Sequence, residues 1–144
     1  MEISCKSEYA LLALLELASH YDGGEPLQIR QIAAEQNIPD RYLEQLLATL
    51  RRGGIVKSQR GAKGGYILAR EPWKITLLEV MGCLEGLSNS PDEEPNPKTL
   101  ESAVIQEVWL EARQAADLVL KNYTLQDLCD RSLARKQVNL MYYI

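Results

Sequence analysis

The polar side chains best suited to chemistry in this sequence lie at the start of one amphipathic segment. From about residue 40 to residue 52, leucines recur at helical spacing, so the polar residues between them face outward. Glutamine can pair with adenine and glutamate can accept a hydrogen bond from cytosine, so such a face can read bases in a major groove. The outward residues near the start of this helix are Asp40, Arg41, Glu44 and Gln45. The simpler interpretation pairs Glu44 with Arg41 or Arg51 inside the helix, for about 0.2–0.5 kcal/mol.

Basic residues are concentrated in the part of the chain that follows. Between residues 45 and 70 there are six basic residues and no acidic one, although the chain carries a net charge of -4. The rest of the chain contains the other ten Lys and Arg and all twenty Asp and Glu, so its net charge is -10. A local basic surface on an acidic body still attracts phosphate, because salt screens charges farther apart than about 10 Å. The alternative interpretation is a solvated charged face. The six residues are Arg51, Arg52, Lys57, Arg60, Lys63 and Arg70.

The surrounding pattern predicts the elements that position these residues. The periodicity indicates a first helix at about 7–19, with Ser4 or Ser7 as its N-cap, and Gly53-Gly54 ends the third helix. Two short β-prone segments around a glycine-rich loop indicate a hairpin. This order predicts a mainly α fold with a small β-hairpin wing, a winged helix–turn–helix. The segments are helices at about 7–19, 29–36 and 40–52, then strands at 55–58 and 66–69.

The second half of the chain predicts a long helix of a different kind. A capping box at 76–79 opens a fourth helix that Gly86 closes. The stretch 87–97 is rich in proline and acidic residues, which indicates a mobile loop. A helix from about 99 to 121 follows, then a last short helix capped at Thr124. For the tail 138–144, two alternatives stay open: an added strand, or packing on a partner subunit. We therefore expect a DNA-binding domain at 1–86, a flexible loop at 87–98, and a dimerisation helix with a C-terminal segment at 99–144.

The long helix carries more apolar surface than a small domain can cover. It spans over 20 residues, or about 30 Å, and has too few polar residues to project alone into water. Packing against the same helix of a second subunit would bury it, and two-fold dimers are the commonest oligomers. Ile105, Trp109, Ala116 and Leu118 widen the apolar side. The predicted dimer stripe is Leu100, Val104, Val108, Ala112, Ala115 and Val119.

Several functional classes are disfavoured by the sequence. No apolar run approaches the roughly 20 residues of a membrane span, and the first residues lack the plan of a secretory signal, so we expect a cytoplasmic protein. The motifs of common hydrolases, metalloproteases and phosphate-binding loops are missing, so no enzyme is expected. Three scattered cysteines fit neither a disulfide framework nor a metal site. Cys83 and Cys129 fit small buried hydrophobes, and Cys5 near the start is a candidate for exposure.

Residues 42–70, YLEQLLATLRRGGIVKSQRGAKGGYILAR, carry a specific resemblance. They resemble the Rrf-two family of bacterial regulators (the IscR, NsrR and CymR type), as do KSEYALLAL at 6–14, the long helix and residues 124–128. The resemblance implies that Glu44 and Gln45 contact bases. It also implies that Arg60 enters the minor groove, where A-tracts enhance the negative potential. The other candidates for wing and backbone contacts are Tyr9, Arg51, Ser58, Gly61, Lys63, Gly64 and Gly65.

The resemblance implies a transcriptional regulator of double-stranded DNA. We expect a sequence-specific homodimer on a two-fold operator, with half-sites about 10 bp, or multiples of it, apart. The expected role is repression in response to a redox, small-molecule metabolite or protein signal. The alternative is a winged-helix module that binds other proteins and not specific DNA, which the basic residues of the wing and third helix speak against.

The ligands of the family's cofactor are missing from their usual places. Cluster-binding members carry three cysteines before the long helix, and some have a histidine near its start. Here residues 88–97 contain neither cysteine nor histidine, and Gln106 stands at the place of that histidine. An iron–sulfur cluster needs about four ligands, mostly thiolates, so we expect no cluster through the usual ligands and no metal site. Glu8 stands where some members have an acidic ligand, but a solvated or phosphate-facing role suits it better. His20 suits the C-terminal end of the first helix.

Overall fold

A computed structural model describes residues 3–85 and 99–142, and the side chains of residues 3–85 and 99–141. Three helices build the first layer: α1 (Cys5–Ser19), α2 (Ile29–Gln36) and α3 (Asp40–Arg52). Ser4 is the N-cap of α1, and its hydroxyl accepts a hydrogen bond from the Ser7 amide at 3.2 Å. The apolar stripes of these helices meet in one core, where Leu14, Ile32 and Leu47 are fully buried. The predicted helix–turn–helix is therefore present.

Two glycines end α3 and start the wing. Gly54 has φ 77°, and its amide donates to the Arg51 carbonyl at 3.1 Å. The Ile55 amide donates to the Leu50 carbonyl at 3.0 Å, which completes a Schellman motif. The chain leaves this motif directly into β1 (Val56–Gln59), which pairs antiparallel with β2 (Gly65–Leu68). The predicted hairpin is confirmed, with both strands shifted by one residue because Ile55 belongs to the helix stop.

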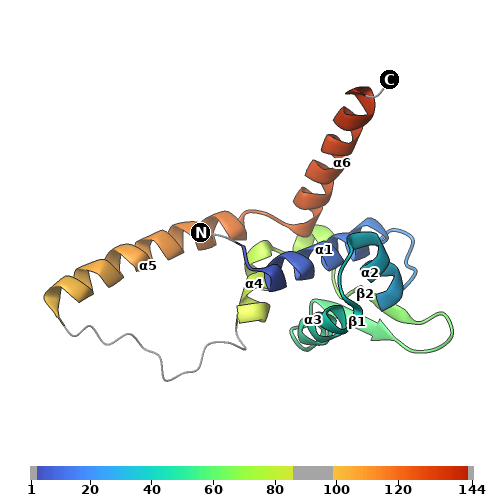
Figure 1. Cartoon of the computed structure of the whole chain (residues 1–144), viewed down its shortest axis with the longest axis horizontal. Helices are drawn as coiled ribbons and strands as arrows, with labels where there is room; N and C mark the ends of the chain where they lie inside the picture. Colours follow the sequence, from blue (N-terminus) through green and yellow to red (C-terminus); the bar gives the residue numbers. More distant parts are fainter. Residues whose placement is uncertain (1–2, 86–98, 143–144) are drawn as a thin grey trace.

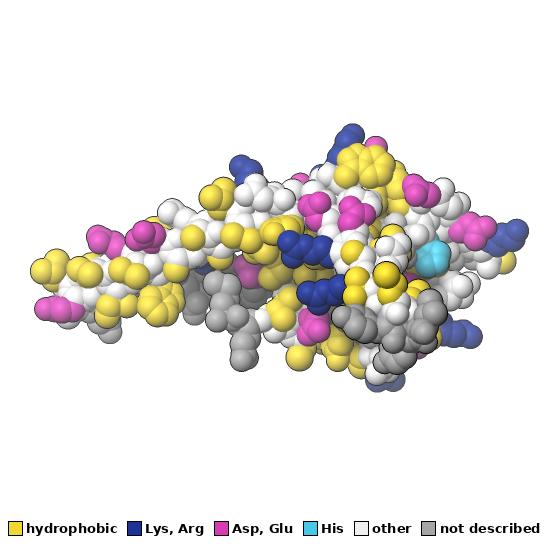
Figure 2. All heavy atoms as spheres, turned by 90° about the horizontal axis from the view of Figure 1, so that it is seen from above, with side chains coloured by type: hydrophobic (Ala, Val, Ile, Leu, Met, Phe, Trp, Pro, Cys, Tyr) yellow, Lys and Arg dark blue, Asp and Glu magenta, His cyan; other side chains and the backbone are white. Residues whose placement is uncertain are grey.

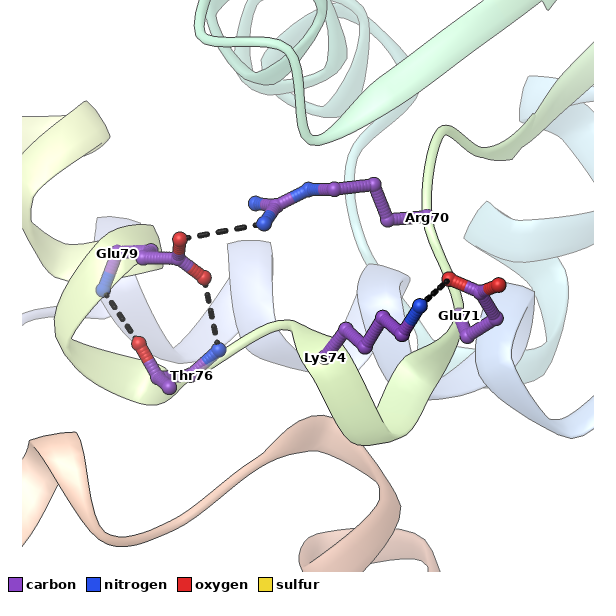
Figure 3. A network of polar contacts seen from close by, with 5 residues as sticks. All are labelled: Arg70, Glu71, Lys74, Thr76 and Glu79. Atoms are coloured by element: carbon purple, nitrogen blue, oxygen red, sulfur yellow. Dashed lines mark hydrogen bonds and ion pairs between the residues drawn. The ribbon is translucent and has the colours of Figure 1, made fainter.

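A network of polar contacts fixes the segment after the wing (Figure 3). A short 3-10 helix, η1 (Pro72–Lys74), leads to α4 (Leu77–Glu85). The predicted capping box is present, because the Thr76 amide donates to Glu79 Oε2 at 3.0 Å and the Glu79 amide donates to the Thr76 hydroxyl at 3.2 Å. Arg70 joins it through an ion pair of 3.2 Å to Glu79. The predicted end of this helix at Gly86 and the predicted loop at 87–98 lie outside the described residues.

The last two helices extend away from the core in different directions (Figure 1). They are α5 (Leu100–Lys121) and α6 (Leu125–Tyr142). The prediction of a short last helix is wrong: α6 has 18 residues, and the tail to residue 142 is helical rather than a strand. No glycine or proline follows Lys121, so nothing in the sequence ends this helix early. None of the described helices is long and apolar enough to cross a membrane.

The start of α6 is anchored in the core. The Leu125 amide donates to the Ile75 carbonyl at 3.0 Å, and the Leu77 amide donates to the Tyr123 carbonyl at 2.9 Å. Asp127 caps the helix by accepting from the Thr124 amide at 2.8 Å. Leu125 is fully buried with the leucines of the first three helices. Only the far part of α6 is left to project.

Candidate nucleic-acid interface

The polar face predicted on α3 is exposed. Asp40, Arg41, Glu44 and Gln45 are all solvent-accessible, while the leucines on the other side of the helix are buried. Within the described part of the chain, Glu44 makes no ion pair with Arg41 or Arg51. The intrahelical pairing considered as an alternative is therefore not formed, and the Glu44 carboxylate is available to a ligand.

An open groove of about 500 Å³ connects α3 with the wing and with the start of α2. Its walls come from three segments that are far apart in the sequence. Each wall carries polar side chains or exposed backbone, so the groove offers hydrogen-bonding groups along its length. The lining residues are Gln28, Ile29 and Arg30 from α2 and its N-cap, Asp40 and Glu44 from α3, and Gln59, Gly61, Gly64, Gly65 and Tyr66 from the wing.

Five of these residues, Gln28, Ile29, Arg30, Gln59 and Tyr66, were missed by the sequence reasoning. Arg30 is the second residue of α2, the helix that crosses the DNA backbone in a helix–turn–helix. The amide of Gln28 donates to Gln31 Oε1 at 2.8 Å, so the start of α2 is held in place. The available signal was the position of a basic residue at the first turn of the first motif helix. Arg30 lies outside the basic stretch of residues 45–70.

The wing glycines are required by close backbone contacts. A Cβ at Gly65 would collide with the carbonyl oxygen of Leu27, and one at Gly64 would lie 2.9 Å from the Gly61 carbonyl oxygen. Leu27 and Tyr66 exchange two backbone hydrogen bonds of 3.0 and 2.7 Å, which seat the wing against the segment before α2. Gly64 and Gly65 therefore allow the wing to pack against the segment before α2, and this packing maintains the groove.

The predicted wing and backbone contacts fall into two groups. Arg60 and Lys63 are exposed in the wing loop beside Gly61. Arg51 and Ser58 are brought together at the base of the wing, where Arg51 Nη1 lies 3.5 Å from Ser58 Oγ. The wing loop thus carries two cationic side chains, and Arg51 and Ser58 offer hydrogen-bond donors at the base of the wing.

Tyr9 lies on α1 rather than on the wing. It is half-buried, and its ring packs edge-on against Tyr42 at a centroid distance of 5.6 Å. Tyr9 is still partly exposed, and its contact with a DNA phosphate stays a prediction. Tyr42 is half-buried against the core.

The described residues do not fit an iron–sulfur cluster. The cysteines lie in three different helices, and the described residues hold no group of three or more His, Cys, Asp or Glu that could bind a metal ion. Burial raises the pKa of the Cys83 thiol, which donates to the Thr49 carbonyl at 3.4 Å. Burial, helped by the charge of Asp130, also raises the pKa of Cys129. Metal ligation needs thiolates, and a raised pKa opposes them.

The remaining sequence predictions concern single residues. Cys5 is exposed, whereas Cys83 and Cys129 are half-buried rather than fully buried. His20 caps the C-terminal end of α1, and its Nδ1 lies 3.0 Å from the Glu16 carbonyl oxygen, as the helix-end prediction required.

The long helix α5 has no buried residue. Every member of its predicted dimer stripe is exposed; Leu100 is 79 % and Val104 is 52 % exposed. Figure 2 shows hydrophobic side chains along the projecting arm that α5 forms. A monomer leaves this surface in water.

Comparisons with known proteins agree with this geometry. Residues 3–131 match the Rrf2 family, described as "Iron-dependent Transcriptional regulator". The transcriptional regulator CymR of Bacillus subtilis (strain 168) is 37% identical over 146 residues, covering 99% of both chains. A putative transcriptional regulator of Synechocystis sp. (strain ATCC 27184 / PCC 6803 / Kazusa) is 42% identical over 129 residues, covering 89% of this chain and 87% of the relative.

Solved structures give the same assignment. The structure of IscR from T. potens has a TM-score of 0.75 at 38% identity and covers 92% of this chain and 88% of that one. The structure of CymR from B. subtilis has a TM-score of 0.72 at 38% identity and covers 91% and 98%. The order of helices and hairpin on which the prediction rested is thus shared with these regulators. The chain belongs to the Rrf2 family of winged-helix, DNA-binding transcriptional regulators.

Proposed function

We propose that this protein is a homodimeric repressor that reads a two-fold operator through α3 and the wing. The observation that carries the proposal is the groove shared by α2, α3 and the wing, which joins base-reading groups to phosphate-binding groups. The proposed domains are 1–86 for DNA binding, 87–98 for a linking loop and 99–144 for dimerisation. A dimer of this size covers two successive half-sites and excludes other proteins from them, which supports repression.

Each predicted contact residue, whether it lines the groove or lies outside its lining, has a proposed role. Asp40, Arg41, Glu44 and Gln45 enter the major groove, where Gln45 pairs with adenine and Glu44 accepts from cytosine. Arg60 enters the minor groove at the wing. The phosphate contacts, which set register without reading sequence, come from Tyr9, Arg51, Ser58, Lys63 and the wing glycines Gly61, Gly64 and Gly65. Arg30 joins them at the start of α2.

The signal enters this proposal as a small molecule, a partner protein or a thiol reaction. The raised pKa values of Cys83 and Cys129 oppose thiolate chemistry at those two positions, so Cys5 is the thiol best placed to react. Because the described residues do not fit a cluster, no step of the proposed function passes through iron.

The substitution Gln45→Ala tests the base-reading role. Loss of a bidentate contact to adenine costs about 1–3 kcal/mol of discrimination, so the variant should lose about 5- to 150-fold in preference at one position of each half-site. The measurement is a competition titration of duplexes that vary at single positions. Gln114→Ala, an exposed glutamine on α5, is the matched control and should keep the wild-type profile. Unchanged preference in Gln45→Ala would contradict the role of α3 in the readout.

A further inference from the structure

The apolar surface of α5 is too wide for one partner helix. Steps of four residues advance by about 40° beyond a full turn, so the stripe from Leu100 through Val104 and Val108 to Ala112 turns through about 120°. Two helices that pair along a single seam bury a stripe narrower than about 100°. Pairing of α5 with its copy through Val108 and Ala112 therefore leaves the Leu100 end uncovered, and Leu100 is 79 % exposed.

The uncovered end of α5 is flanked by negative charge. Leu100, Val104, Glu107 and Glu111 follow the spacing i, i+4, i+7, i+11, so they share one face of the helix. Residues 100–112 contain three acidic residues and no basic one. All four residues of this face are exposed. This face, called the α5 acidic face below, combines an apolar half with an acidic half.

The projecting part of α6 has the complementary composition. Residues 133–141 are all exposed and contain two basic residues and no acidic one. Leu133, Lys136 and Leu140 follow the spacing i, i+3, i+7 and share one face, called the α6 basic face. Leu133 is 58 % and Leu140 65 % exposed, and Met141 beside them is 77 % exposed. Arg135 lies on the opposite side of the helix.

The two faces do not meet within one chain. α5 packs on α4, and the start of α6 packs on α1 and η1. The free parts of both helices point away from each other (Figure 1). The projecting segment of α6 is about 14 Å long and the acidic arm of α5 about 20 Å, so the first fits along the second.

We infer that the α6 basic face of each subunit docks on the α5 acidic face of its partner, with Lys136 beside Glu107 and Glu111. The contact is reciprocal, as a two-fold axis requires, and it rests on the dimer of the proposed function. It makes α6 a second dimerisation element and gives the pairing its charge specificity. A like charge placed at such a contact disfavours association strongly.

Charge reversal in two different chains tests the contact. Lys136→Glu and, separately, Glu107→Lys with Glu111→Lys should each raise the dimer dissociation constant about tenfold or more, because like charges then face each other in both homodimers. Mixing the two variants restores opposite charges at both contacts, so heterodimers of near wild-type affinity should form. Sedimentation equilibrium of the full-length chains, with one variant carrying a fluorescent label, measures all three species.

Arg135→Glu is the matched control, with the same change of charge on the neighbouring residue but on the other side of α6. It should shift the dissociation constant by less than about twofold. Recovery in the mixture shows that the parent variants are folded. Wild-type dimerisation of Lys136→Glu, or a mixture no stronger than its parents, would overturn the α6 contact alone. A wild-type chain that sediments as a monomer would overturn the proposed dimer itself.

Discussion

At the residue scale, the wing loop combines a cation with backbone that only glycine fits. Arg60 and Lys63 are exposed beside Gly61, whose φ of 113° suits a residue without a side chain. Gly64 and Gly65 lie where a Cβ would strike backbone oxygen atoms. The geometry of the wing and its charge therefore come from different residues, and substitutions can separate the two contributions.

Arg60→Ala should weaken specific DNA binding and relax the preference for a narrow minor groove. An arginine inserted there gains from the enhanced negative potential of A-tracts, so the loss should reach about tenfold on a site with an A-tract and less on one without. Fluorescence anisotropy on the two duplexes measures both affinities. Lys74→Ala removes an exposed cation from η1 and is the control. Equal affinity and equal preference in Arg60→Ala would remove the arginine from the interface.

Gly65→Ala should destabilise the protein by about 1–3 kcal/mol, because the new methyl group meets the Leu27 carbonyl and forces the wing from its seat. Urea unfolding measures the free energy. Gly82→Ala, on α4, is the matched control: nothing lies within 4 Å of its Cβ, so it should stabilise the helix by about 0.5–1 kcal/mol. A Gly65 variant as stable as the wild type would show that the wing is not seated by this contact.

At the element scale, local sequence signals explain most boundaries. Ser4 caps α1, Gly53-Gly54 forms the Schellman stop of α3, and Thr76 with Glu79 caps α4. Each signal acts within a few residues, so it can be recognised in the sequence. The one-residue shift of both strands follows from Ile55, whose amide completes the stop of α3.

The capping box makes part of the stability depend on pH. Partial burial acts to raise the pKa of Glu79, but the hydrogen bond from the Thr76 amide and the charge of Arg70 bring it below its ordinary value. A lowered folded pKa stabilises the protein above the unfolded pKa, and this contribution is lost as the pH falls through the folded pKa. Glu79 therefore stabilises the native state at neutral pH and loses that effect in acid.

Glu79→Gln should lower the free energy of unfolding by only about 0.5 kcal/mol at pH 7, since solvent screens the ion pair. The Arg70 and Glu79 side chains are 40% and 42% exposed. The difference from the wild type should shrink as the pH falls through the lowered folded pKa of Glu79, because the carboxylate is then protonated. Urea unfolding between pH 3 and 7 measures it, with Glu71→Gln as the control. A difference that is constant across this range would contradict the charged cap.

Features that depend on distant contacts were not predictable in the same way. The groove joins residues near 28, 40 and 60, and no local pattern shows that Gln28 and Gln59 line one wall each. The predicted last helix was too short: α6 extends to residue 142, and no glycine or proline after Lys121 ends it. The fold and the α3 residues followed from local periodicity, whereas the membership of the groove followed from tertiary packing.

At the scale of the whole molecule, the exposed apolar face of α5 requires a partner. Its stripe is apolar over most of 22 residues, yet no residue of the helix is buried. A second copy would cover this surface and would also space two recognition helices along one face of the DNA. A dimer that pairs through α5 is therefore expected to bind an operator with the same two-fold symmetry.

Val108→Glu should split the dimer, because it places a charge in the middle of the stripe. Val108 is 55% exposed in the monomer, so the fold itself should survive, with an unchanged circular dichroism spectrum. Sedimentation velocity should show the monomer at concentrations where the wild type is dimeric. Gln114→Glu adds the same charge one turn beyond Glu111 on the α5 acidic face, where it would face the basic Lys136, and should remain dimeric. Unaltered sedimentation of Val108→Glu would refute the α5 interface.

Operator reading by a dimer can be tested by selecting binding sites for the wild-type protein from a library of random duplexes. A two-fold symmetric sequence should be recovered, with half-sites about 10 bp, or a multiple of that, apart, because two recognition helices bind one face of the DNA. Enrichment of no sequence, or of a single unsymmetric half-site, would contradict a dimeric repressor that reads an operator through α3 and the wing.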